Sequence, residues 1–121
     1  MISGIVNDRR ATVNVVFILP NQPSLSIGFV IDTGFTGYLC LPPEAVNLLG
    51  LSFIHNLPIN LADNTEVIVS VHSATILWNA EERDITILAT GRRPLLGTAL
   101  LYEHELVVQF TEGGLVTIDA L

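Results

Sequence analysis

One acidic residue of this chain stands where an apolar run ends and a turn begins. The tripeptide Asp32-Thr33-Gly34 follows the apolar residues 27–31 and occurs once in the 121 residues. A carboxylate at the end of a buried strand is costly to desolvate unless it accepts hydrogen bonds or shares a proton. The position of Asp32 therefore suggests acid–base chemistry, although the chain carries no second copy of the tripeptide with which Asp32 could share that proton.

An ordinary turn in an unrelated β-barrel is the alternative interpretation of this tripeptide. Asp and Thr side chains bond to nearby backbone groups, and Gly accepts positive φ, so the three residues also suit a structural turn. Three neighbouring features favour chemistry: an apolar strand before Asp32, a polar-tipped hairpin in the middle of the chain, and the segment Leu95-Leu96-Gly97 near the end.

The elements that must position Asp32 are predicted to be mostly strands. Short blocks of β-branched and aromatic residues, separated by turn residues, predict an all-β sandwich or barrel with one or two short helices. The predicted strands cover residues 2–6, 12–19, 24–31, 38–41, 59–61, 67–77, 83–90, 105–110 and 115–118, and the predicted helices cover 42–50 and 98–102. No repeat or linker divides the chain, so we expect one domain over residues 1–121.

Composition and charge exclude two kinds of partner. Twelve acidic residues stand against five basic ones, giving a net charge of −7, which removes the attraction on which nucleic-acid binding depends. The longest apolar stretches, residues 13–19 and 95–101, are far shorter than the roughly 20 residues of a membrane span. Hydrophobic residues still make up 50% of the chain, so we expect surplus apolar surface in a groove or a subunit interface.

Cysteine and histidine usage indicates a cytoplasmic protein without a metal or other cofactor. The first ten residues lack a secretory signal, and the one cysteine, Cys40, lies in an apolar segment, where we expect a buried small hydrophobe. His55, His72 and His104 lack the close spacing of a helical zinc pair. Trp78 is expected either in the core or in a subunit interface.

The order of these features resembles the retropepsin-like aspartic proteases, the single-lobed relatives of pepsin, and in particular their bacterial members. The resemblance spans nearly the whole chain and implies a closed barrel of the acid-protease type. It implies that Asp32 is the catalytic aspartate, that Thr33 joins two active-site loops, and that the backbone of Gly34 approaches the carboxylates. It also implies that Leu96 and Gly97 belong to the loop that passes beneath the active-site loop.

The resemblance also implies a substrate-binding flap. The hairpin of residues 59–71 is similar to the flap that closes over bound peptide in this family. The residues expected to contact substrate are those of the hairpin tip and the residue after the tripeptide, namely Ala62, Asp63, Asn64, Thr65 and Phe35.

The chemistry of this family requires two carboxylates. Two carboxylates about 3 Å apart cannot both ionise, so one takes a proton from water while the other, protonated, polarises the peptide carbonyl. Because each chain supplies one Asp32, the resemblance implies a two-fold homodimer.

Three departures from the viral pattern accompany the resemblance. Phe35-Thr36-Gly37 follows the tripeptide where viral members have alanine and then acidic residues. Thr98 stands where an arginine is expected, and Thr36 replaces the acidic partner of that arginine, so both ends of an internal ion pair are absent together. Residues 105–121 form a full hairpin, which predicts a dimer without the interleaved terminal sheet of viral members.

The sequence thus predicts a homodimeric aspartic endopeptidase that acts on a peptide or protein substrate. The alternative is a non-catalytic module on the same fold, whose groove binds a peptide or another partner while Asp32 completes a buried hydrogen-bond network.

Overall fold

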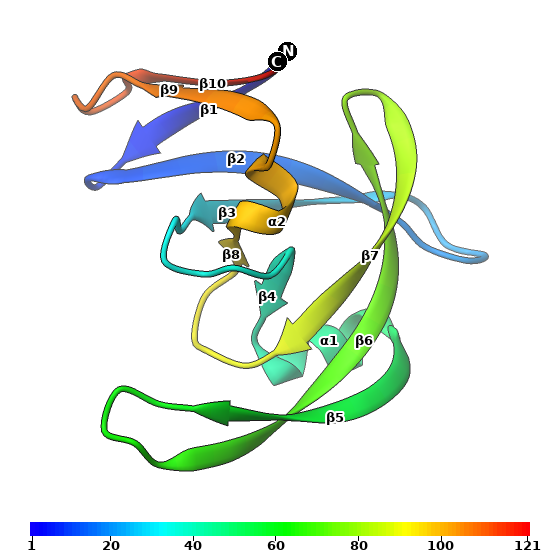
Figure 1. The fold of residues 1–121 in the computed structure, drawn as a ribbon. Coiled ribbons are helices and arrows are strands. Elements are labelled where there is room, and N and C mark those ends of the chain that lie inside the picture. Colours follow the sequence, from blue (N-terminus) through cyan, green and yellow to red (C-terminus); the bar gives the residue numbers. More distant parts are fainter.

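The computed structural model describes residues 1–121 and consists of one continuous sheet with two short helices (Figure 1). The strands are β1 (Ile2–Asn7), β2 (Arg10–Ile18), β3 (Leu25–Ile31), β4 (Leu39–Leu41), β5 (Ser52–Asn60), β6 (Glu66–Trp78), β7 (Glu81–Ala89), β8 (Leu95–Leu96), β9 (His104–Val108) and β10 (Leu115–Ala120). The helices are α1 (Pro43–Leu49) and α2 (Thr98–Leu101).

Six of the ten strands close into a ring. The sheet order is β5-β6-β7-β4-β8-β3-β2-β1-β10-β9, and the long strand β6 also pairs with β2. This extra pairing joins residues 16–18 of β2 to residues 75–77 of β6, so the pairings lead from β2 through β3, β8, β4, β7 and β6 back to β2. The predicted all-β class, the two short helices and the closure of the sheet are therefore confirmed.

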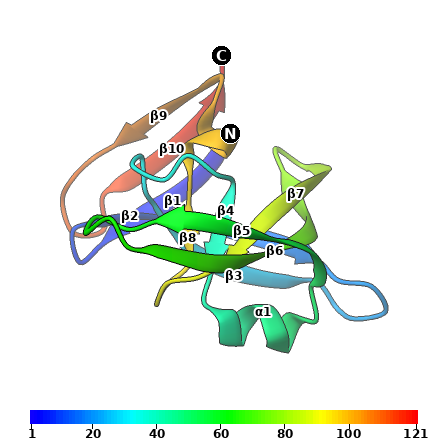
Figure 2. The ribbon, with the colours of Figure 1, turned by 60° about the horizontal axis from the view of Figure 1, so that its bottom comes forward.

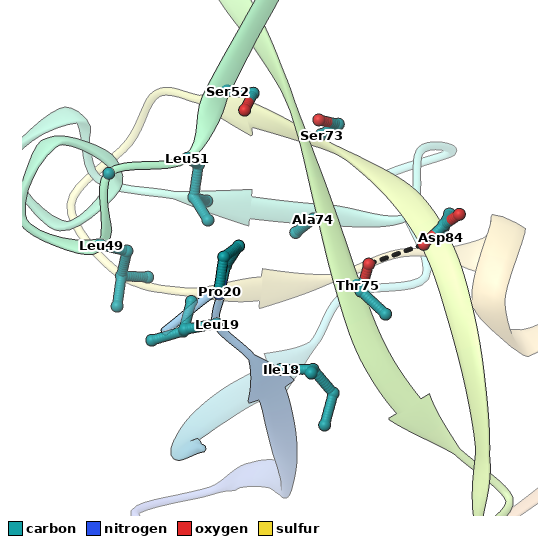
Figure 3. A pocket seen from close by; sticks show the side chains of 11 residues that line it. Ile18, Leu19, Pro20, Leu49, Leu51, Ser52, Ser73, Ala74, Thr75 and Asp84 are labelled. Carbon is teal, nitrogen blue, oxygen red and sulfur yellow. Dashed lines mark hydrogen bonds between the residues drawn. The ribbon is translucent and has the colours of Figure 1, made fainter. Parts of the chain in front are cut away.

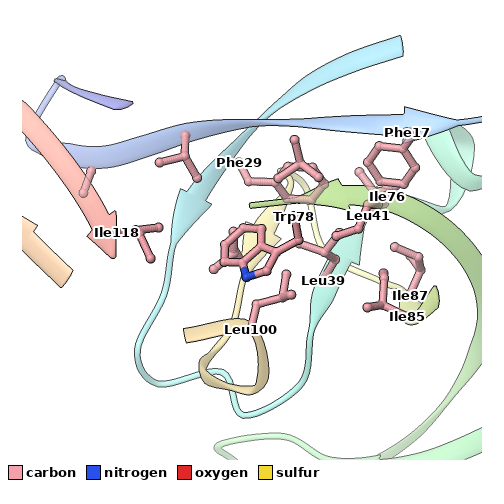
Figure 4. Close-up of a cluster of buried hydrophobic side chains, with 14 of the residues drawn as sticks. Phe17, Phe29, Leu39, Leu41, Ile76, Trp78, Ile85, Ile87, Leu100 and Ile118 are labelled. Atoms are coloured by element: carbon pink, nitrogen blue, oxygen red, sulfur yellow. The ribbon is translucent and has the colours of Figure 1, made fainter. Parts of the chain in front are cut away.

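The core fills this ring with side chains from all six of its strands (Figure 4). Phe17 and Phe29 are fully buried and stack with their ring centroids 6.0 Å apart. Trp78 is 5% exposed and packs in the same cluster, so within the chain it is a core residue. Burial of large aromatic side chains from β2, β3 and β6 stabilises the closed pairing of these strands.

Local sequence signals explain two of the connections. The β1–β2 hairpin turns at Asp8 and Arg9, whose positive φ values of 51° and 62° suit a two-residue hairpin turn. Helix α1 begins with Pro43 and ends at Gly50, which has a left-handed φ of 64° and caps the last turn.

The two ends of the chain pair with each other. Strand β10 lies between β9 and β1, with Ile118 opposite Ile2, and Figure 1 shows the termini side by side. The predicted terminal hairpin is therefore confirmed, and its inner strand pairs with the N-terminal strand of the same chain.

The mid-chain hairpin is longer than expected. Strand β5 begins at Ser52 rather than at residue 59, and nearly all its side chains are exposed, so the strand has no buried alternation to mark its start. The β5–β6 hairpin projects from the ring on the side where the loop after β3 lies (Figure 1 and Figure 2).

Neither of the two helices has the length and apolar character needed to cross a membrane.

Candidate active site

Asp32 is held by its neighbours in the chain and by a strand distant in sequence. β3 runs parallel to β8, with Ile31 beside Leu96. The next backbone N–H, that of Asp32, donates to the carbonyl oxygen of Leu96 at 2.9 Å. The carboxylate oxygen Oδ1 accepts a hydrogen bond from the N–H of Gly34 at 2.9 Å. Asp32 is half-buried, so one carboxylate oxygen is oriented by the turn while the group keeps access to solvent.

Gly97, between β8 and α2, packs against the loop after β3. This loop, residues 32–38, is called the active-site loop here because it contains the predicted catalytic Asp32. The N–H of Gly97 donates to the carbonyl oxygen of Tyr38 at 2.9 Å. A Cβ at this position would lie 2.2 Å from the carbonyl oxygen of Gly37 and 2.7 Å from that of Phe35. Only glycine permits this approach, so the structure gives a physical reason for the residue that the sequence singled out.

Thr98 extends the connection between the two loops. Its backbone N–H and its hydroxyl Oγ1 both donate to the carbonyl oxygen of Phe35, at 2.8 and 3.3 Å. Where the family resemblance implies an arginine, this chain thus uses a neutral side chain that bonds directly to the backbone of the active-site loop.

The ring of Phe35 packs over two glycines. Positions where a Cβ would be built on Gly37 and Gly97 lie 2.7 and 2.6 Å from atoms of the ring. The ring therefore occupies space that side chains at either glycine would need. Phe35 is half-buried and also lines the pocket described next, so its ring forms part of the pocket wall.

A pocket of about 820 Å³ lies between the active-site loop and the β5–β6 hairpin. The hairpin contributes mainly apolar side chains from its arms: Leu57, Ile59, Leu61, Val67, Val69 and Val71. Residues 34–38 of the active-site loop line the opposite side, while Asp32 itself lies next to the lined region. Such a mostly apolar cleft with a few polar groups is typical of ligand sites.

The predicted tip residues and the pocket are separate. Ala62, Asp63, Asn64 and Thr65 form the turn of the hairpin, but the lining comes from the arms on either side of them. Sequence reasoning missed these arm residues, although valines at every second position, 67, 69 and 71, share one face of a strand.

The tip itself is held by a local hydrogen-bond network. Oδ1 of Asp63 accepts from the backbone N–H of Thr65 at 3.0 Å and from its hydroxyl at 2.6 Å. These bonds favour the ionised carboxyl, so they hold the pKa of Asp63 below its usual value. Asn64 takes a φ of 67°, which asparagine tolerates in such turns.

Thr33 and Gly34, the other two residues of the Asp32 tripeptide, are exposed. A surface hydroxyl beside Asp32 is available to a second molecule, whereas the backbone of Gly34 is already used on the carboxylate.

Cys40 forms part of the pocket wall and is 4% exposed, as predicted for a buried hydrophobe. Its Sγ donates to the carbonyl oxygen of Thr90 at 3.4 Å. Burial raises the pKa of the thiol to about 11, and the nearby charge of Asp32 acts in the same direction. A thiol in this state is a poor nucleophile at neutral pH.

The three histidines are dispersed, and no group of three or more His, Cys, Asp or Glu side chains is arranged to hold a metal ion. His72 is buried and bonds through Nδ1 to the carbonyl oxygen of Leu51 and through Nε2 to Ser70. His104 accepts a hydrogen bond from the indole N–H of Trp78 at 3.3 Å. Both side chains therefore have structural partners.

A second pocket, of about 350 Å³, lies between the end of α1 and β6 (Figure 3). It holds none of the predicted site residues. Its one carboxylate, Asp84, accepts a hydrogen bond from the hydroxyl of Thr75 at 2.6 Å, and no second acidic residue lines it. This pocket has no arrangement for acid–base chemistry of the kind considered above.

Comparison with known proteins supports the fold. No protein-family model matches the sequence, and no curated protein matches it. Among solved structures, the chain is similar to the crystal structure of a retropepsin-like aspartic protease from Rickettsia conorii, with a TM-score of 0.59 and 19% sequence identity. The likeness covers 98% of this chain and 91% of that chain. The chain has the retropepsin-like fold.

Proposed function

We propose that this chain is an aspartic endopeptidase, active as a homodimer, that hydrolyses peptide bonds in a peptide or protein substrate. The observation that carries the proposal is the position of Asp32, at the end of β3, with its backbone bonded to Leu96 and its carboxylate bonded to Gly34. Asp32 is half-buried and lies beside a cleft that the β5–β6 hairpin lines.

The chemistry follows from pairing two such loops across a two-fold axis. The exposed Thr33 and Gly34 allow a second copy to approach, which would bring two Asp32 carboxylates together. The pair would hold one proton, so that the ionised carboxylate takes a proton from water and the neutral one polarises the peptide carbonyl. Water is the nucleophile, and no cofactor takes part.

The β5–β6 hairpin would act as the flap in this proposal. Its apolar arms form one wall of the pocket, and its tip residues, from Ala62 to Thr65, would contact the substrate backbone when the hairpin closes. We further propose that residues 1–121 form one domain that works in the cytoplasm, where the single thiol of Cys40 stays reduced.

Replacement of the aspartate tests the proposal. Asp32→Asn keeps the size of the side chain and the acceptor for Gly34 but cannot ionise, so we expect it to fold while losing cleavage of a peptide library. Asp84→Asn is the matched control, because Asp84 lies outside the site and its partner Thr75 can still donate to an amide oxygen. Retained cleavage in Asp32→Asn would exclude the proposed chemistry. Peptide binding without turnover by the unaltered protein would instead identify a non-catalytic binding module.

A further inference from the structure

A β-bulge in the β5–β6 hairpin places His55 on the pocket side. Phe53 pairs with His72, whereas His55 pairs with Val71, so the register shifts by one residue at Ile54. Because side chains alternate between the two faces of a strand, the extra residue puts His55 on the face of Val71, which lines the pocket. Without the bulge, His55 would lie on the opposite face with His72.

His55 is the one side chain in the pocket lining that can carry a positive charge. The lining contains no Lys, Arg, Asp or Glu, and its other titratable groups are Tyr38 and Cys40. Burial raises the pKa of the Cys40 thiol to about 11, so this group stays neutral in acid. β6 and β7 contribute valine, threonine and leucine only, and the nearest acidic group along the loop is Asp32.

The imidazole has one nitrogen engaged by the protein. Nδ1 lies 3.0 Å from the backbone carbonyl oxygen of Asn56, an acceptor, so Nδ1 carries a hydrogen and donates. This bond leaves Nε2 for a group that enters the pocket. His55 is also exposed, so its protonated form is hydrated before a ligand arrives.

We propose that His55 is a specificity-determining residue that selects substrates with a carboxylate side chain in this pocket at mildly acidic pH. The inference rests on the proposed function and names the substrate class of the same site. Protonated imidazole donates a charge-assisted hydrogen bond from Nε2 to the carboxylate, while the methylene groups of glutamate pack on the apolar hairpin arms. Protonation turns the neutral imidazole into a cation, so the attraction is expected in mild acid, where a glutamate side chain is still ionised.

Pairs of peptides that differ only in Glu against Gln test this proposal. The pair is placed at each position in turn around the cleaved bond, and kcat/KM is measured from pH 5 to pH 8. At one position we expect kcat/KM to be at least about threefold higher for the Glu peptide than for the Gln peptide near pH 5.5. At pH 8 the two values should be about equal. The ratio at each pH cancels the titration of the catalytic carboxylates, because both peptides meet the same enzyme.

Two variants separate charge from shape. His55→Gln keeps a polar side chain without a charge, so the Glu to Gln ratio should be close to one at every pH. His55→Lys keeps a positive charge up to pH 8, so the preference for Glu should persist there. Equal cleavage of the two peptides at every position near pH 5.5, or an unchanged preference in His55→Gln, would overturn the proposal.

Measurements of peptide affinity test the role of His55 independently of the proposed peptidase activity. Calorimetry with Asp32→Asn protein measures the affinities of the same Glu and Gln peptides without turnover. Tighter binding of Glu peptides at pH 5.5 than at pH 8 would support the role of His55 even if the unaltered protein cleaved nothing. Cleavage without any preference for Glu would support the proposed function and reject the role of His55.

Discussion

The backbone N–H of Asp32 donates a hydrogen bond to the carbonyl oxygen of Leu96, with 2.9 Å between the two atoms. The residue before Asp32 pairs with Leu96 in the parallel β3–β8 ladder, and the residue after Leu96 is the glycine that contacts the active-site loop. The position of the carboxylate is therefore fixed by a ladder of backbone bonds as well as by its own turn. Changes in the Leu96-Gly97 segment should act on the site through this connection.

Gly97→Ala is expected to disrupt the active-site loop. Its Cβ would lie 2.2 Å from the carbonyl oxygen of Gly37, and backbone atoms cannot yield there as a flexible side chain could. We expect a loss of more than about 2 kcal/mol in the free energy of unfolding, measured by urea denaturation, and loss of any peptidase activity. Gly28→Ala on β3 is the control, since its Cβ would meet only the Asn14 side chain at 3.3 Å. Equal stability of the two variants would contradict this account of Gly97.

Phe35→Ala should both destabilise the protein and enlarge the pocket. The ring packs on Gly37 and Gly97, and its removal leaves a void beside the active-site loop. We expect a cost of about 2 to 3 kcal/mol in the free energy of unfolding and cleavage of peptides with bulkier side chains. Phe53→Ala removes a ring that is 58% exposed and should cost less than about 1 kcal/mol. A Phe35→Ala protein as stable as the Phe53→Ala control would show that the ring is not needed there.

Cys40 should resist alkylation in the folded protein. Burial raises its pKa from 9.0 to about 11, so the thiolate is scarce at pH 8. We expect slow reaction with iodoacetamide at pH 8 by mass spectrometry, and fast reaction when urea unfolds the chain. The pKa of Cys40 is higher in the folded chain than in the unfolded chain. The contribution of its protonated thiol to the free energy of unfolding is therefore complete below about pH 9 and is lost as pH rises through about 11. The stability difference between the protein and Cys40→Ala should therefore shrink over that range, and rapid alkylation of the folded protein would contradict the burial.

The hydrogen bonds of Asp63 should make the hairpin tip sensitive to acid. Thr65 lowers the pKa of this carboxyl, so the ordering of the tip is complete above the ordinary pKa of aspartate and is lost as pH falls through the lowered value. Thr65→Val removes the hydroxyl donor and should raise the pKa of Asp63, as followed by NMR titration of its carboxyl carbon. The carboxyl of Asp119, outside the hairpin, serves as the internal control. An unchanged titration of Asp63 in Thr65→Val would contradict the hydrogen bond from the Thr65 hydroxyl to Asp63.

Much of this fold could be predicted from sequence because its signals are local. Gly50 and the Asp8-Arg9 turn stand at positions of positive φ, where backbone geometry restricts residue type, and they lie between elements that the sequence predicts. Gly97 was singled out by its place after two leucines, and its lack of room for a Cβ supplies the reason.

The remaining features depend on pairing between distant segments. The start of β5 at Ser52 could not be predicted, because most side chains of that strand are exposed and its residues do not alternate between buried and exposed. The bulge at Ile54 arises from the register between β5 and β6, which decides the face of His55 and which no local pattern of residues reveals. The packing of the Phe35 ring likewise depends on Gly97 from another part of the chain.

In the proposed dimer each Asp32 forms half of a site, and mixing of subunits tests this pairing. Unaltered protein and Asp32→Asn are unfolded together in different proportions and refolded, with the amount of unaltered protein held constant. If each site needs two Asp32 carboxylates, peptidase activity should fall to about one half with one equivalent of the variant and about one quarter with three, because random pairing leaves those fractions of unaltered chains in matched dimers. Asp84→Asn added in the same way should cause no such fall. Activity that stays constant as Asp32→Asn is added would contradict the shared site.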